Sequence, residues 1–110
     1  MKRASNRRSE RLGDLILREL STLLLEEVKD PRVEGVTLTG VRMNTDLRIA
    51  EVLFTAGQDE EKRAQAQEGL KRATGFLRTR LGRRLDLRYM PELRFIPDEF
   101  LEDMVYAHSD

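Results

Sequence analysis

The chain has 110 residues, of which 39% are hydrophobic and 36% charged, and its 20 basic and 20 acidic side chains balance to a formal net charge of zero. This composition predicts one globular domain over residues 1–110 with a modest core. The lack of cysteine excludes disulfides and thiolate metal sites, and no apolar run is long enough for a secretory signal or a membrane span, so we expect a cytoplasmic protein without a membrane partner.

The first predicted element is an amphipathic helix from about Ser9 to Lys29. Ser9 is its expected N-cap, and Asp30-Pro31 its expected stop. Residues 1–8 precede it as a basic arm. Apolar side chains recur in the helix at spacings of three and four: Leu12, Leu15, Ile16, Leu20, Leu23, Leu24 and Val28.

Two strands should follow, over residues 36–43 and 47–57. Both segments are rich in β-branched residues and partly alternating, and the short polar turn 44–46 between them predicts a hairpin. The apolar positions change parity near Gly40, which predicts a β-bulge there.

The pattern becomes helical again from Asp59. Its apolar positions are Ala66, Leu70, Ala73, Leu77 and Leu81. Residues 91–98 then alternate like a strand, and Pro91 requires an edge position or a strand boundary. Residues 98–110 form an acidic tail whose apolar residues could make a short helix.

Charge is unevenly spread along the chain. Residues 71–94 carry eight basic and two acidic side chains, and residues 1–18 carry six and two. Two basic blocks of this kind are candidates for binding a polyanion. Sixteen of the twenty basic residues are arginine, which suits phosphate contacts.

The stretch RATGFLRTRLGRR, residues 72–84, combines these arginines with small residues. On a helical wheel, Gly75, Thr79 and Gly82 form a strip opposite the apolar face, with Lys71 and Arg78 on one side and Arg72 and Arg83 on the other. Small residues would let a nucleic-acid backbone approach closely, and a kink at Gly75 would add a second helix N-terminus. Alternatively, Gly75 only separates two helices among solvated arginines.

Other chemistry has little support. His108 is the single histidine and lies near the end of the chain, so the protein is not expected to be an enzyme. The acidic residues Asp98, Glu99, Glu102 and Asp103 fit a solvated face better than a metal site. Phe76 and Tyr89 lie among arginines, but we interpret both as core or half-buried rather than as a stacking platform.

Several segments together resemble the ribosome-binding factor A family of bacterial small-subunit assembly factors. They are DPRV at 30–33, VTLTGVRMNTDLRIAEVLF at 36–54, Ala73-Thr74-Gly75 followed by FLR, and PELRFIPD at 91–98. The resemblance implies an α+β, type II KH-like domain in the order helix-strand-strand-helix-kink-helix-strand. An interrupted helix at Ala73-Thr74-Gly75 would replace the GXXG loop of ordinary KH domains.

The family also implies a function. The chain is expected to bind the free 30S subunit and its 16S rRNA around the 5′-terminal helix as a monomer without a cofactor or metal. It should assist 5′-end processing of the precursor, with a role in cold adaptation and an assembly GTPase as a partner. The expected RNA-binding residues are Arg7, Arg8, Arg11, Lys71, Arg72, Ala73, Thr74, Gly75, Arg78, Arg80, Arg83 and Arg84. A KH-like protein that binds RNA generally, or a protein-interaction module using the first helix, is the alternative.

Overall fold

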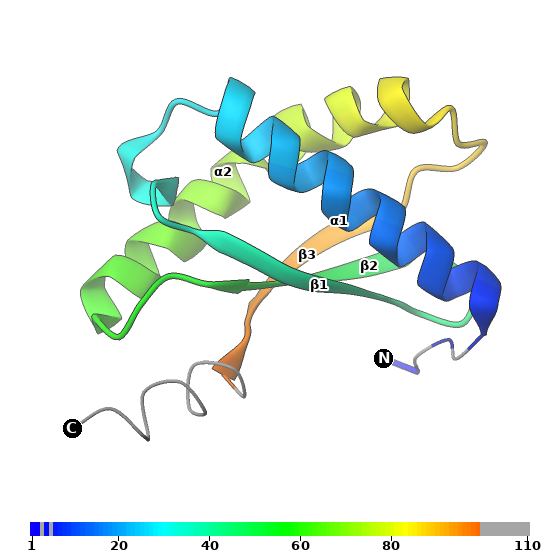
Figure 1. Cartoon of the computed structure of the whole chain (residues 1–110), viewed down its shortest axis with the longest axis horizontal. Coiled ribbons are helices and arrows are strands. Elements are labelled where there is room, and N and C mark those ends of the chain that lie inside the picture. Colours follow the sequence, from blue (N-terminus) through cyan, green and yellow to red (C-terminus); the bar gives the residue numbers. More distant parts are fainter. Residues whose placement is uncertain (3, 5, 100–110) are drawn as a thin grey trace.

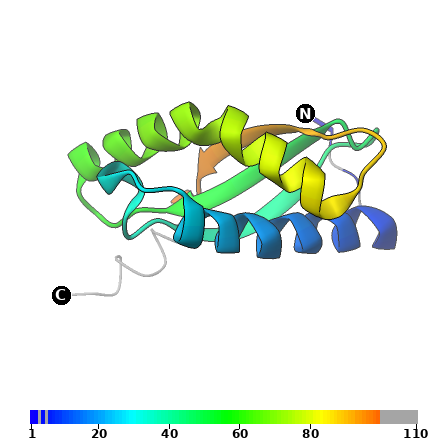
Figure 2. The same ribbon diagram turned by 90° about the horizontal axis from the view of Figure 1, so that it is seen from above.

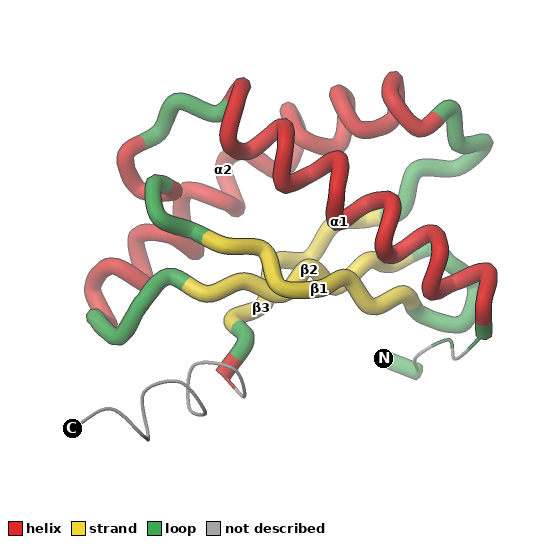
Figure 3. Tube along the Cα trace, viewed as in Figure 1, coloured by secondary structure: helices red, strands yellow, loops and turns green. Residues whose placement is uncertain are grey.

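The computed structural model of the chain describes residues 1–2, 4 and 6–99. Two helices cover one face of a three-stranded sheet, as Figures 1 and 3 show. The elements in chain order are α1 (Arg7–Glu27), the 3₁₀ turn η1 (Pro31–Val33), β1 (Thr37–Met43), β2 (Ile49–Thr55), α2 (Glu60–Leu85) and β3 (Glu92–Pro97). The α+β class is therefore as predicted.

The sheet has the order β1-β2-β3. The hairpin pair β1 and β2 is antiparallel, whereas β3 returns from α2 to lie parallel to β2. The β1–β2 register shifts between Leu38 and Gly40, which confirms the predicted bulge. Pro91 precedes β3 directly, and β3 is an edge strand, so the restriction that proline imposes is met in both ways.

The core lies between the sheet and the two helices. Alternate residues of β2 point to the helices and are buried, namely Ala50, Val52 and Phe54. The helices contribute buried side chains to the same core, and these include most of the predicted apolar positions: Ile16, Leu20, Leu23 and Leu24 from α1, and Ala66, Leu70, Leu77 and Leu81 from α2.

Helix α1 begins two residues earlier than predicted. Asn6 is the N-cap: its side-chain oxygen accepts from the backbone N–H of Ser9 at 2.8 Å, and the Ser9 hydroxyl oxygen accepts from the backbone N–H of Asn6 at 3.3 Å. Ser9 thus completes a capping box from the third helical position. Arg7 and Arg8 consequently belong to the first turn of α1. The helix ends at Glu27, just before the Asp30-Pro31 stop.

Glycine sets how closely α1 approaches the sheet. A Cβ atom placed on Gly13 would lie 2.7 Å from the backbone oxygen of Val41 in β1. No other residue fits this contact without a shift of the strand or the helix, which is one reason why α1 packs over β1.

Helix α2 corrects the most specific structural prediction. It is a single helix of 26 residues, and no break occurs at Ala73-Thr74-Gly75. The hydroxyl groups of Thr74 and Thr79 donate to the carbonyl oxygens of Leu70 and Gly75, four residues earlier, at 2.8 and 3.0 Å. Such bonds favour bending, and Figure 2 shows α2 bent between its two halves. The helix continues because its buried residues on both sides of the glycine outweigh a cost of about 1 kcal/mol.

None of the helices in residues 1–2, 4 and 6–99 has the length and apolar character needed to cross a membrane. The predicted tail helix, together with Glu102, Asp103 and His108, lies outside the described residues.

Candidate nucleic-acid interface

The exposed side of α2 carries the predicted basic residues. Its buried side holds Leu70, Leu77 and Leu81, and the cations that point away from the core are Lys71, Arg72, Arg78, Arg80, Arg83 and Arg84. Because α2 is continuous, these residues keep one helical arrangement. The second helix N-terminus that a break would have created does not exist.

The small residues of this face differ in access. Gly75 and Thr79 are exposed, and a Cβ atom on Gly75 would meet nothing within 4 Å. Gly82, in contrast, lies under the sulfur of Met90, which would be 4.0 Å from a Cβ atom there. The open part of the predicted strip is therefore its Gly75–Thr79 half.

Two cations beside this open segment have no partner. Within the part of the chain that the structure describes, neither Lys71 nor Arg83 makes a hydrogen bond or an ion pair. Arg72 pairs with Glu68 one turn earlier, at 3.2 Å. Among the α2 cations of the predicted interface, Lys71 and Arg83 are thus the side chains most available to an anion.

Arg80 and Arg84 form ion pairs with acidic side chains of α1 and remain partly exposed to solvent. Arg84 contacts Glu19 at 3.1 Å and Glu27 at 3.3 Å, and Arg80 approaches Glu27 at 3.7 Å. Pairs exposed to this extent contribute about 1 kcal/mol or less. These contacts join residues 53 to 65 positions apart, so no local sequence pattern could have revealed them.

Arg78 has a structural contact. Its guanidinium group donates to the carbonyl oxygens of Met90 at 2.9 Å and Pro91 at 3.2 Å, in the loop between α2 and β3. It therefore holds this loop against α2, a role that the sequence did not indicate. Ala73 and Thr74 are half-buried, so neither side chain stands on the open face.

Arg7, Arg8 and Arg11 form a separate exposed group on the first turns of α1. Figures 1 and 2 place the start of α1 and the C-terminal end of α2 toward the same end of the long axis. Before the helix, the carbonyl oxygen of Lys2 accepts from the backbone N–H of Thr45 at 3.0 Å, so the arm contacts the hairpin.

The two aromatic residues among the arginines are not buried, and our interpretation of them was wrong. Phe76 is 40% exposed and Tyr89 is 76% exposed. Each lies beside an arginine: the guanidinium carbon of Arg80 is 5.2 Å from the Phe76 ring centroid, and that of Arg88 is 5.5 Å from the Tyr89 centroid. Both distances fit cation–π contacts.

Residues 30–33 pack against α2 beside its basic face. Asp30 and Arg32 form an ion pair at 2.6 Å, and the hydrogen bond from the Arg32 side chain lowers the pKa of Asp30 to about 2. A Cβ atom on Gly69 would lie 2.8 Å from Val33 and 3.1 Å from Arg32, so glycine permits this contact. The DPRV segment stood out in the sequence but Gly69 did not, because the contact between them is tertiary.

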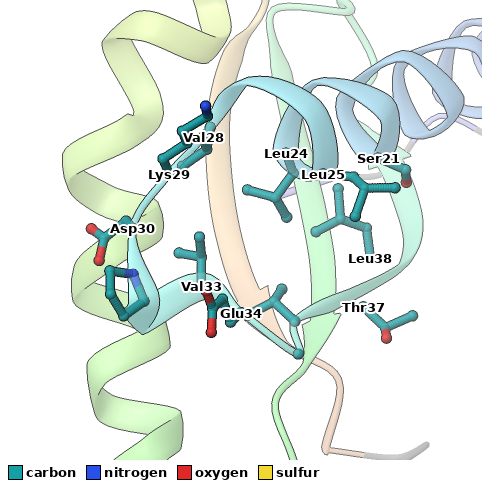
Figure 4. Close-up of a pocket in the computed structure, with 13 residues that line it drawn as sticks. Ser21, Leu24, Leu25, Val28, Lys29, Asp30, Val33, Glu34, Thr37 and Leu38 are labelled. Atoms are coloured by element: carbon teal, nitrogen blue, oxygen red, sulfur yellow. The ribbon is translucent and has the colours of Figure 1, made fainter.

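A groove of about 700 Å³ lies at the other end of α1 (Figure 4). Its apolar lining includes Leu24, Leu25, Val28 and Leu38, and Leu25 is 86% exposed. Among the described residues, no group of three or more acidic or histidine side chains could hold a metal ion. Asp98, one of the acidic candidates, accepts from the Thr39 hydroxyl at 2.7 Å.

The model of the family described as ribosome-binding factor A matches residues 8–109. The chain belongs to the ribosome-binding factor A family. Ribosome-binding factor A of Thioalkalivibrio sulfidiphilus is 52% identical over 95 residues, which cover 86% of this chain and 74% of that protein.

Solved members of the family share the fold. The crystal structure of ribosome-binding factor A from Thermus thermophilus aligns with a TM-score of 0.70 at 30% identity, covering 81% of this chain and 94% of that one. A homology model of the Thermus protein, fitted into a cryo-EM map of a complex with the 30S subunit, aligns with a TM-score of 0.64 at 31% identity over 76% of this chain and 88% of that one. The fold of this chain is accordingly KH-like, as predicted.

Proposed function

We propose that the chain is an assembly factor of the small ribosomal subunit, which binds the free 30S subunit and its 16S rRNA around the 5′-terminal helix and is needed for efficient 5′-end processing of the precursor. One observation carries the proposal: the open backbone at Gly75 is flanked by the unpaired cations Lys71 and Arg83. The fit of a Thermus relative to a 30S complex supports the choice of particle.

The residues of the proposed interface have different roles. Gly75 and Thr79 let the rRNA backbone approach α2, and Lys71 and Arg83 neutralise its phosphates. Arg72, Arg80 and Arg84 can also bind phosphates, because a phosphate can replace the carboxylates that they contact in the free protein. Arg7, Arg8 and Arg11 give a second contact at the start of α1. Ala73 and Thr74 act by shaping the bend of the helix.

The chain works by binding and not by cutting. Contacts of this kind read the backbone and shape of RNA, so affinity should fall steeply as salt rises, with a slope of roughly −0.7 per phosphate contact for unpaired RNA. No residue is assigned a catalytic role and no cofactor is needed. The protein acts as a monomer in the cytoplasm, supports growth in the cold, and leaves the subunit with the help of a GTPase.

One observation favours a second candidate, a protein-interaction module built on α1. The lining of the groove beside Leu25 is mostly apolar, and it carries the most exposed of the large apolar side chains named above. Exposed apolar surface of this kind suits a protein contact. In that case the charge of α2 would not matter for ribosome binding.

Complementation tests the proposal. A bacterium lacking its own ribosome-binding factor A should accumulate 16S rRNA with an unprocessed 5′ end, and this chain should restore processing. A Lys71→Glu, Arg83→Glu variant should fail. A Lys62→Glu, Arg48→Glu variant makes the same two charge reversals at exposed positions outside the proposed interface, and it should succeed. Equal processing with both variants would refute the proposed site.

A further inference from the structure

The loop between α2 and β3, residues 86–91, is held in place at three points. Arg78 donates two hydrogen bonds to its carbonyl oxygens, Met90 lies over Gly82, and Pro91 is fully buried. Its first residue, Asp86, has the left-handed conformation that ends α2. These contacts give the loop a fixed position relative to the basic face.

This fixed loop exposes one large hydrophobic side chain. Tyr89 is 76% exposed, and its hydroxyl makes no hydrogen bond to the described residues. Leu25, the other strongly exposed side chain of this size, is aliphatic and lies by the apolar groove. A ring exposed on a braced loop has no evident role in stabilising the fold.

The chemistry of the loop fits a nucleobase. The Arg88 guanidinium carbon stands 5.5 Å from the centroid of the Tyr89 ring, which leaves the ring a second face. Bases stack on tyrosine regardless of sequence, and an adjacent arginine adds a cation for the backbone of the same nucleotide. Aromatic side chains commonly hold unpaired bases in RNA-binding proteins.

The loop also lies beside the proposed path of the RNA. Arg78 and Gly82, which anchor it, are on the same side of α2 as Gly75 and Thr79. An RNA backbone that follows this side toward the C-terminal end of α2 would arrive at Tyr89.

We propose that Tyr89, supported by Arg88, stacks an unpaired base of the RNA that α2 binds. This inference rests on the proposed function and adds a base-stacking site to a surface otherwise made of cations and open backbone. The rRNA recognised here is then partly single-stranded at the point where its path leaves α2.

Binding of the full chain to free small subunits, measured across a salt series, tests the inference with three variants. Tyr89→Phe keeps an aromatic ring, Tyr89→Leu keeps only apolar volume, and Gln58→Ala is the control for loss of a neutral exposed side chain outside both candidate surfaces. Because both positions are exposed, all variants should keep the thermal unfolding temperature of the natural chain.

Loss of one base stack predicts that Tyr89→Leu binds roughly 5- to 100-fold more weakly with an unchanged salt slope. Tyr89→Phe and Gln58→Ala should bind as the natural chain does. Natural affinity of Tyr89→Leu, or an equal loss in the phenylalanine and leucine variants, would overturn the stacking site and leave the proposed function standing. Failure of the natural chain to bind would overturn both.

Discussion

Replacing Gly75 by alanine separates the structural role of this glycine from its role in binding. Gly75 lies inside an uninterrupted helix, its φ is not positive, and the added methyl group would meet nothing within 4 Å. Alanine is favoured over glycine in a helix by about 1 kcal/mol. Gly75→Ala should therefore raise the free energy of unfolding by about 1 kcal/mol, or the melting temperature by roughly 4 °C for a domain of this size.

Urea and thermal unfolding followed by circular dichroism would measure the change. Gly82→Ala is the matched control, because Met90 is at ordinary contact distance there and a similar gain is expected. If RNA approaches the open backbone, only Gly75→Ala should also weaken binding to small subunits. A drop in stability for Gly75→Ala would refute the reasoning, since it would mean that the backbone at this position needs glycine.

Three further predictions concern the fold around the interface. Gly13→Ala should lower the free energy of unfolding by about 1–2 kcal/mol, because overpacking against the Val41 oxygen at 2.7 Å exceeds the gain in helix propensity; unchanged stability in urea would contradict this contact. Arg78→Met should lower the free energy of unfolding by about 1 kcal/mol and speed amide hydrogen exchange in the loop that Arg78 holds. Unchanged exchange would mean that the loop keeps its position without the hydrogen bonds of Arg78. The pKa of Asp30 is lowered to about 2 by Arg32, so its contribution to stability should be complete above about pH 4 and disappear as pH falls toward 2. Melting temperatures of the natural chain and Asp30→Asn should therefore converge over that range, and a difference independent of pH would refute the role of the ion pair.

Local patterns predicted most of the elements. The apolar spacing around Ile16 and Leu20 identified α1, the change of parity at Gly40 identified the bulge, and Pro91 marked the start of β3. These features depend on neighbours in the sequence, which is why they could be read from it.

The errors arose where distant residues decide the outcome. The sequence at Gly75 favours a break, but Leu70 and Leu77 are anchored in the core on both sides and keep α2 continuous. Tyr89 was taken for a half-buried residue because the sequence does not show that Arg78 fixes its loop at the surface.

The sequence predicted which basic residues lie on the exposed face of α2, but not the partners that some of them contact. The cations of α2 are exposed as expected, yet the partners of Arg80 and Arg84 come from α1. Which arginines are free to bind is a property of the packed helices. Lys71 and Arg83 could be separated from the other cations only in the structure.

Co-sedimentation with purified small subunits, large subunits and assembled ribosomes across a salt series tests the central claim most directly. The natural chain should bind free small subunits selectively. The Lys71→Glu, Arg83→Glu variant should lose this binding, and the charge-matched Lys62→Glu, Arg48→Glu variant should keep it. Equal binding of the natural chain to every particle, or undiminished binding of the first variant, would contradict the account.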